Sequence, residues 1–450
     1  MKIAINNGIL VDPKNKIFKK INLLIENGKI KELSDKKLSG DEELDCHELY
    51  ISPGFVDMHM HEDSIVNEEI KINIFEKMLK MGVTTAIGGN CGIGSSNIKE
   101  YFSIIEKGNP VNFGSFLPHS ILRKYIEAND RYENLESQDI EKMYQYGKNL
   151  IKECGLFGIS FGIEYIPGID FNELITLASL GKNRIISAHL RDDGDNVFEA
   201  LDEFLEIGNY IKAHLQISHI GSMAGYGQMD KFLSAVEEKR KKGIDVSCDC
   251  YPYAAFSTHI GSAVFDNDYI KRHKVEYNCL EVMEGKYKVQ RCTEKLFNTL
   301  RKELPNTLVT GHMMLEKDIE TALKDPNTII VSDGILGEDG NGHPRATGTF
   351  PRFISKYVRD KKLMSLYEGI EKITSQPAKL LKLNKGSLEI GADADITIFS
   401  LEEIEDRATF ADSSLSPVGI KYVLIDGEIA LKNGKVINSK LGKIVEYPKI

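Results

Sequence analysis

The sequence predicts an α/β fold, a (β/α)8 or TIM barrel that carries a small β-sandwich domain. Three observations indicate this fold. Short apolar segments alternate with longer helical stretches, both chain ends contain successive short strands, and metal-binding side chains follow several of the central strands. Such alternation is typical of parallel βαβ units. Eight units close a barrel more readily than they form an open sheet.

Both ends of the chain are predicted to be rich in strands. Residues 1–52 contain KIAINNGILVD and KINLLIENGKIKEL, in which Asn-Gly pairs suit tight hairpins. Residues 385–450 contain LEIGADADITIF, GIKYVLIDGEIAL and KVINSKLGKIVEY, which have the pattern of further strands. Because chain termini often lie close together, we expect these two segments to form one small β domain.

Residues 53–384 are predicted to form the barrel. The candidate strands are GFVDMHMH, TTAIGGN, VNFGSFLPH, FGISFGIEY, RIISAHLR, AHLQISHIG, DVSCDCYPY and TIIVSDG. Helical stretches such as NIFEKMLKMGV and KFLSAVEEKRKKG separate most of them. The stretch at about 254–306 is polar and irregular for a strand-to-helix connection. We expect it to be an insertion over the barrel mouth that could act as a lid.

Composition and charge exclude several classes of protein. The 450 residues include 57 basic and 67 acidic side chains, a net charge of −10, which argues against nucleic acid or anionic lipid as main partners. No apolar run approaches the ~20 residues that span a membrane, and the N-terminus lacks the apolar segment of a signal peptide. Seven cysteines without closely spaced pairs, apart from Cys248 and Cys250, indicate reduced thiols. We expect a cytoplasmic protein, and the sequence is compatible with a homo-oligomer.

Polar side chains stand at the predicted carboxyl ends of the strands, where the active site of a barrel forms. Imidazole, thiolate and carboxylate groups are good zinc ligands, and residues two apart on a strand face the same side. The candidate ligands are His59 and His61 at the first strand, Cys91 after the second, His189 at the fifth, His219 at the sixth and Asp333 at the eighth. Glu164 ends the fourth strand at the same rim. It could be a bridging ligand, but we favour an exposed loop position.

Several segments carry a resemblance to a known family. PGFVDMHMHED resembles the opening signature of the amidohydrolase superfamily, and GGNCG resembles its D-aminoacylase branch, the N-acyl-D-amino-acid deacylases. AHLRDD, ISHIG, VSDG and HPRATGTFPRFI agree with that branch, and the similarity runs from about Pro53 to Phe399. The resemblance implies a Zn²⁺-dependent hydrolase that acts on a linear amide, releasing a carboxylate and a free D-amino acid.

The resemblance also implies roles for single residues. Cys91, His189 and His219 would hold a tightly bound zinc ion, and His59, His61 and Asp333 would surround a second, weaker metal position. Asp333 would act as general base and acid for the metal-activated water. The family's substrate contacts fall on Arg345, Tyr253 and Ser257. One departure is clear: the family usually has a lysine two residues after the histidine of the sixth strand, and this sequence has Gly221.

Three alternatives stay open. The chain could be a dipeptidase, or a cyclic amidase of the dihydroorotase or hydantoinase kind. Cyclic amidases usually carry a carboxylated lysine at the end of the fourth strand, where this sequence offers Glu164, and this difference disfavours them. A barrel that has lost catalysis and serves as a scaffold is disfavoured by the complete set of candidate ligands.

Overall fold

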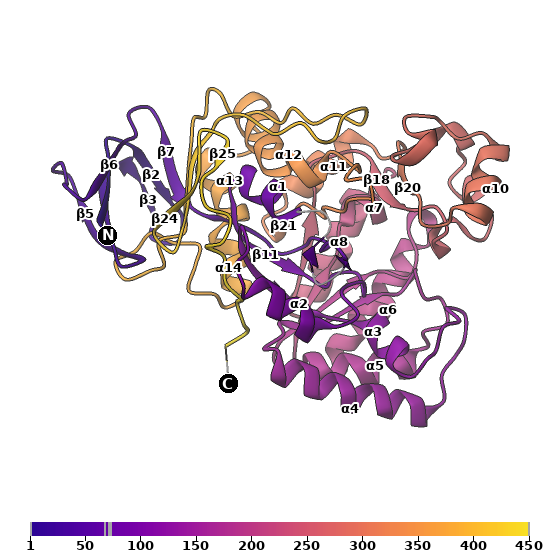
Figure 1. Cartoon of the computed structure of the whole chain (residues 1–450). Helices are drawn as coiled ribbons and strands as arrows, with labels where there is room; N and C mark the ends of the chain where they lie inside the picture. The colour runs from indigo at the N-terminus through magenta and orange to yellow at the C-terminus, as the bar shows by residue number, and fades with distance from the viewer. Residues whose placement is uncertain (1, 67–68, 71–73, 449–450) are drawn as a thin grey trace.

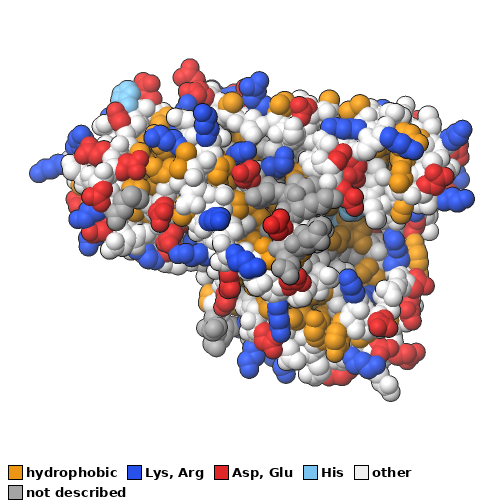
Figure 2. Space-filling model, viewed as in Figure 1, with side chains coloured by type: hydrophobic (Ala, Val, Ile, Leu, Met, Phe, Trp, Pro, Cys, Tyr) orange, Lys and Arg blue, Asp and Glu red, His pale blue; other side chains and the backbone are white. Residues whose placement is uncertain are grey.

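The computed structural model describes residues 2–66, 69–70 and 74–448 and has a mixed α/β fold, as predicted (Figure 1). Parallel strands surrounded by helices form the larger part of the molecule. Mostly antiparallel sheets built from the chain ends lie beside it, at the left of Figure 1. Acidic and basic side chains are interspersed over the face seen in Figure 2.

The eight predicted central segments all contain strands, and the third is divided at Phe116 into two. The strands are β8 (Phe55–Asp57), β11 (Val83–Gly88), β12 (Asn112–Ser115), β13 (Leu117–Pro118), β14 (Gly158–Gly162), β15 (Ile185–His189), β16 (His214–Ile217), β17 (Val246–Cys250) and β21 (Thr328–Ile330). They form two sheets, in the orders β12-β11-β8 and β13-β14-β15-β16-β17-β21, and every pairing is parallel. Parallel strands are covered on both faces, which explains why these segments are apolar almost throughout.

Helices separate most of these strands. They are α1 (Ile74–Lys80), α2 (Ile98–Ile105), α3 (His119–Tyr125), α4 (Ser137–Glu153), α5 (Phe171–Ala178), α6 (Val197–Tyr210), α7 (Ile220–Ala224), α8 (Met229–Lys241), α11 (Glu316–Lys324), α12 (Arg345–Arg352), α13 (Leu366–Ile373) and α14 (Ser375–Leu380). Side-chain caps fix several starts: Asn97 begins α2, Asp170 begins α5, and Ser365 forms a capping box with Glu368 at α13. Across the described ranges, no helix combines the length and apolar character needed to cross a membrane.

The two chain ends form two mostly antiparallel sheets, and one of these sheets contains strands from both ends. These strands are β1 (Lys2–Asn6), β2 (Ile9–Asp12), β3 (Ile17–Lys20), β4 (Asn22–Glu26), β5 (Lys29–Ser34), β6 (Glu42–Asp45), β7 (Tyr50–Pro53), β22 (Ile396–Phe399), β23 (Ile420–Ile425), β24 (Glu428–Lys432) and β25 (Lys435–Val436). One sheet has the order β5-β4-β1-β6, and the other has the order β25-β24-β23-β22-β7-β2-β3. In the second sheet β22 pairs with β7, so that Ile398 lies opposite Ile51. These side chains belong to a buried apolar cluster that contains residues from both ends.

The stretch at about 254–306 is folded into helices and strands. It contains β18 (Phe256–His259), β19 (Leu280–Val282), α9 (Tyr269–Arg272) and α10 (Glu294–Glu303). Its two strands flank β20 (Leu308–Gly311) in an antiparallel sheet of order β18-β20-β19. Aromatic contacts among Phe256, Phe265, Tyr269 and Phe297 hold this unit together, and these side chains belong to the same buried cluster as the barrel residues. It lies at the right of Figure 1.

Candidate metal centre and substrate pocket

The six predicted ligands lie at the carboxyl ends of five parallel strands. His59 and His61 follow β8, Cys91 follows β11, His189 ends β15, His219 follows β16 and Asp333 follows β21. Three of them, Cys91, His219 and Asp333, have positive φ angles of 52°, 33° and 48°. L-residues rarely adopt this left-handed region, and such strain persists only where the surrounding structure imposes it. The chain therefore turns sharply at these three ligands.

A cysteine and three histidines converge at the first group of ligand atoms. Cys91 Sγ lies 3.2 Å from His59 Nε2 and 3.3 Å from His219 Nε2. His219 Nε2 lies 3.1 Å from His189 Nδ1. All four residues are buried. The predicted set of Cys91, His189 and His219 is thus brought together, and His59 joins it.

A second group surrounds the carboxylate of Asp333. Its Oδ1 lies 3.1 Å from His61 Nε2 and 3.4 Å from His59 Nε2. Among the residues that the structure describes, His59–Cys91–His219 and His59–His61–Asp333 are each close enough to hold a metal ion. His59 belongs to both groups, so its Nε2 lies between the two candidate positions.

Outer partners orient three of the histidines. His189 Nε2 lies 2.7 Å from Glu164 Oε2, His59 Nδ1 lies 3.2 Å from Asp249 Oδ1, and Ser222 Oγ lies 2.9 Å from His219 Nδ1. Each contact uses the ring nitrogen that faces away from the ligand group, the usual arrangement around metal-binding histidines. No described residue bonds to the buried Nδ1 of His61.

The expected exposed position of Glu164 is wrong, because its side chain is buried. It lies under α9, whose Arg272 pairs with Asp192 and with Asp193 and approaches Glu164 to 3.8 Å. Arg272 is far from Glu164 in sequence, so the residues around Glu164 give no indication that its side chain is buried. Asp249 was also missed, although a single carboxylate within the buried run VSCDC was a usable signal.

The donor atoms fit a zinc ion. Zinc binds cysteine sulfur at about 2.3 Å and histidine nitrogen at about 2.0 Å in a tetrahedron, which separates neighbouring ligand atoms by roughly 3.3–3.7 Å. The separations of 3.1–3.3 Å in the first group are close to these values. A soft thiolate with imidazoles is also the donor set that zinc prefers over magnesium or calcium.

Neighbouring charges set the ionisation of the centre. Burial raises the pKa of the Cys91 thiol, but the charges of His59 and His219 lower it by more. The pKa of Cys91 therefore lies well below its usual value, and the sulfur is a thiolate. Burial also opposes ionisation of Asp333, yet Arg345, His59 and His61 hold the pKa of this carboxyl below its usual range. For Glu164, burial and Asp193 raise the pKa to about 7 against the opposing effect of His189.

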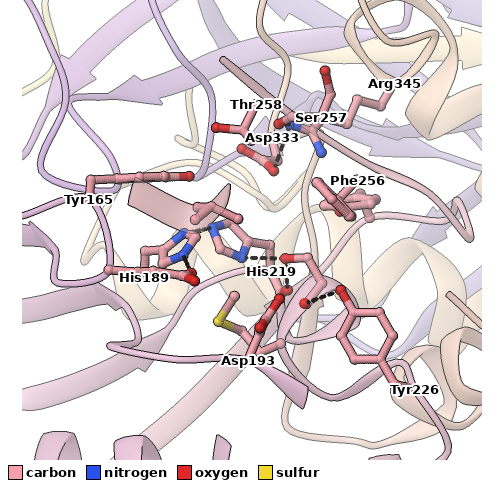
Figure 3. A pocket seen from close by; sticks show the side chains of 15 residues that line it. Tyr165, His189, Asp193, His219, Tyr226, Phe256, Ser257, Thr258, Asp333 and Arg345 are labelled. Carbon is pink, nitrogen blue, oxygen red and sulfur yellow. Dashed lines mark hydrogen bonds and ion pairs between the residues drawn. The ribbon is translucent and has the colours of Figure 1, made fainter. Parts of the chain in front are cut away.

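A pocket of about 30 Å³ opens beside the centre (Figure 3). Asp333, Arg345 and Ser257 lie on one side of it, and Tyr226 and Phe256 lie on another. The insertion supplies Phe256, Ser257, Thr258 and Val264 to the lining. The metal-binding groups therefore face a small cavity that the insertion helps to line.

Arg345 connects the pocket to Asp333. Its Nη2 lies 2.9 Å from Asp333 Oδ2 and 3.3 Å from the Ser257 carbonyl oxygen, and its guanidinium group lies 4.5 Å from the centre of the Tyr251 ring. Its buried Nε has no hydrogen-bond partner among the described residues. Arg345 is thus held in place with donor capacity left for a ligand.

The structure places Tyr253, an expected substrate contact, outside the pocket lining. Its hydroxyl group donates toward Asp406 and the Pro344 carbonyl oxygen, at 3.4 Å each, whereas Tyr251 lines the pocket. At Gly221 a Cβ atom would lie 2.9 Å from Ile319 Cδ1, so the Ile319 side chain would have to shift to admit a lysine there.

Comparisons with known proteins place these features in context. A family model described as the amidohydrolase family matches residues 115–431. The N-acyl-D-glutamate deacylase of Alcaligenes xylosoxydans xylosoxydans is 26% identical, with 95% of this chain and 93% of the relative covered. The D-aminoacylase of that organism is also 26% identical, with 94% and 93% covered. The predicted resemblance is confirmed by these matches.

A solved structure shares the fold. It is an N-acyl-D-glutamate deacylase from Bordetella bronchiseptica, complexed with zinc and a phosphonate inhibitor that mimics the tetrahedral intermediate of its reaction. The TM-score is 0.88 at 22% sequence identity, and 99% of each chain is covered. At this identity, the likeness shows a common fold.

Proposed function

We propose that this chain, which belongs to the amidohydrolase family, hydrolyses the amide bond of N-acyl-D-amino acids to a carboxylate and a free D-amino acid. The observation that carries the proposal is the position of Asp333. One oxygen of its carboxylate faces His59 and His61, and the other forms an ion pair with Arg345 beside the pocket. The relatives named above, a D-aminoacylase and an N-acyl-D-glutamate deacylase, support the substrate class.

The proposed scaffold is a closed (β/α)8 barrel. An isolated parallel bridge between Met60 and Gly334 joins the end of β8 to the end of β21, and β12 runs on through Phe116 into β13. These two links support a ring of eight strands. Residues 53–384 would form this catalytic unit, and residues 1–52 and 385–450 would form the β-sandwich. The insertion at 254–306 would be the lid, since it supplies part of the pocket wall.

The proposed cofactor is Zn²⁺. Cys91, His189 and His219 would hold one ion tightly, and His59, His61 and Asp333 would surround a second, weaker position. The short Cys91–His219, His189–His219 and His61–Asp333 separations and the oriented imidazole of His189 support this assignment. A bound zinc ion supplies a water of pKa about 7 and polarises the amide carbonyl.

The residues of the chain would then handle the proton and the substrate. Asp333 is held ionised, so it can accept the proton of the attacking water and pass it to the leaving nitrogen. Arg345 would bind the α-carboxylate of the substrate, with Tyr251 supporting the guanidinium group. The Ser257 hydroxyl donates to the Val309 carbonyl oxygen in this structure and would turn from it to join Arg345. Glu164 would hold His189 in the ligating orientation.

One panel of substrates tests the proposal. The metal-loaded protein is assayed with N-acetyl and N-formyl derivatives of D- and L-amino acids, with dipeptides and with cyclic ureides, and its zinc content is measured on the same sample. Hydrolysis that favours the D-acyl compounds is expected. Hydrolysis of cyclic ureides alone would replace the proposal by a cyclic amidase. A zinc-replete protein inert towards the whole panel would leave the scaffold alternative.

A further inference from the structure

A second cavity of about 490 Å³, here called the outer pocket, lies beside the substrate pocket. Its walls come from α3 and the loop after it, from the segment after β14, and from β18 of the insertion. Lys124, Arg131 and His259 are among the residues that line it. Arg131 donates a hydrogen bond to the Gly261 carbonyl oxygen, so the loop and the insertion are in direct contact.

The two pockets share a wall made of Tyr165 and Thr258, which line both cavities. The Tyr165 ring centre lies 4.4 Å from that of His189, so this wall adjoins the metal centre. In Figure 3 both residues lie on the side of the centre opposite Tyr226. A group that leaves the centre past Tyr165 and Thr258 would enter the outer pocket.

The outer pocket has free positive charge. Among its described lining residues there is no aspartate or glutamate. Arg123 forms an ion pair with Glu173, with its Nε 2.9 Å from Oε1. By contrast, neither Lys124 nor Arg131 forms an ion pair with any described residue. Burial and the charge of His61 lower the pKa of His259, which leaves it neutral at pH 7. The two free cations therefore suit an anionic ligand group.

The geometry of the centre decides which part of a substrate would reach these cations. The α-carboxylate is assigned to Arg345 and Ser257, and the scissile carbonyl carbon to the metal centre. The side chain of the D-amino acid would then lie against Met223, Tyr226 and Phe256. The remaining group, the acyl chain, is directed past Tyr165 towards the outer pocket.

We propose that the outer pocket is an acyl-group subsite that binds a carboxylate at the far end of the acyl chain. This inference rests on the proposed function. It makes N-acyl-D-amino acids with a dicarboxylic acyl group, such as succinyl or glutaryl, the preferred substrates. Water adds to the amide carbonyl carbon, the C–N bond breaks and the nitrogen takes a proton, so N-succinyl-D-leucine would give succinate and D-leucine. A dipeptide would instead bring its ammonium group towards Lys124 and Arg131, which disfavours a dipeptidase.

The test compares N-acetyl-D-leucine with N-succinyl-D-leucine on the wild type, the double variant Lys124→Met/Arg131→Met and the control Lys182→Met. Lys182 is an exposed lysine just before β15, at the opposite end of that strand from His189. The wild type should show a kcat/KM about three- to tenfold higher for the succinyl compound, the effect of two exposed ion pairs. This ratio should fall towards one in the double variant and with added salt, and it should be unchanged in the control.

Three other results would overturn the subsite. In the first, the wild type shows no preference for the succinyl compound. In the second, the double variant slows both substrates by one factor, which would mean general steering of anions. The third result concerns the case in which neither compound is hydrolysed, so that the proposed function fails. Calorimetry with succinate then tests whether the outer pocket binds a dicarboxylate at all. Succinate that binds the wild type but not the double variant would support the subsite, and no binding to the wild type would refute it.

Discussion

Replacing Asp333 by asparagine is expected to stop most turnover while the metal ligands stay in place. Asparagine keeps the shape of the side chain and can still face His61 and Arg345, which lie 3.1 and 2.9 Å from the carboxylate oxygens. It cannot accept a proton from water. General acid–base help contributes about 10²–10⁴-fold to a rate, so the activation barrier should rise by about 3–5 kcal/mol.

The assay measures zinc content and kcat on the same preparation of Asp333→Asn, with an N-acetyl-D-amino acid as substrate. Asp318→Asn is the control, because it removes a buried carboxylate of α11 that is not part of the pocket lining. It should keep kcat within about twofold, because Asp318 contacts neither the candidate ligands nor the pocket. A metal-replete Asp333→Asn with near-wild-type kcat would refute the assigned role. Loss of zinc in step with activity would make Asp333 a structural ligand instead.

Four further predictions follow from the same geometry. Cys91→Ala should lose most of its zinc, and full occupancy by elemental analysis would exclude Cys91 as a ligand. Glu164→Gln should weaken zinc affinity about 10- to 100-fold in a chelator competition, because the oriented imidazole of His189 loses a charged partner. Arg345→Met should lower kcat/KM by about 10²-fold, the effect of losing a charged hydrogen bond, and an unchanged KM would contradict its role in carboxylate binding. Burial raises the pKa of Asp63 to about 7, so its protonated form stabilises the fold below pH 4 and this stability is lost as the pH rises through 7. The free energy of unfolding of the wild type, compared with that of Asp63→Asn, should therefore fall by about 4 kcal/mol between pH 4 and pH 8. Denaturant titrations that give the two proteins the same dependence of this free energy on pH would contradict the prediction.

The strands and the clustering of the candidate ligands could be predicted because their signals are local. Each ligand stands within or just after a short apolar run, and the carboxyl ends of parallel strands meet by topology. The folded insertion could not be predicted in the same way. Its aromatic contacts join Phe256, Tyr269 and Phe297, which are distant in sequence and follow no helical or strand period.

Two details of the site depended on single turns or distant contacts. Tyr251 and Tyr253 stand on either side of Pro252, and the turn after β17 sends only the first into the pocket. The burial of Glu164 depends on Arg272, which a separate segment of the chain supplies. Local sequence patterns carry neither kind of information, because both are decided by tertiary packing.

The pairing of β22 with β7 has a consequence for biosynthesis. Roughly 340 residues separate the two strands, so at about 5–20 residues per second the ribosome needs on the order of 20–70 s to deliver the partner of β7. Throughout that interval the edge of β7 stays open to wrong partners on neighbouring nascent chains. Chaperone demand should therefore concentrate on the first fifty residues, and it should end when the last strands emerge.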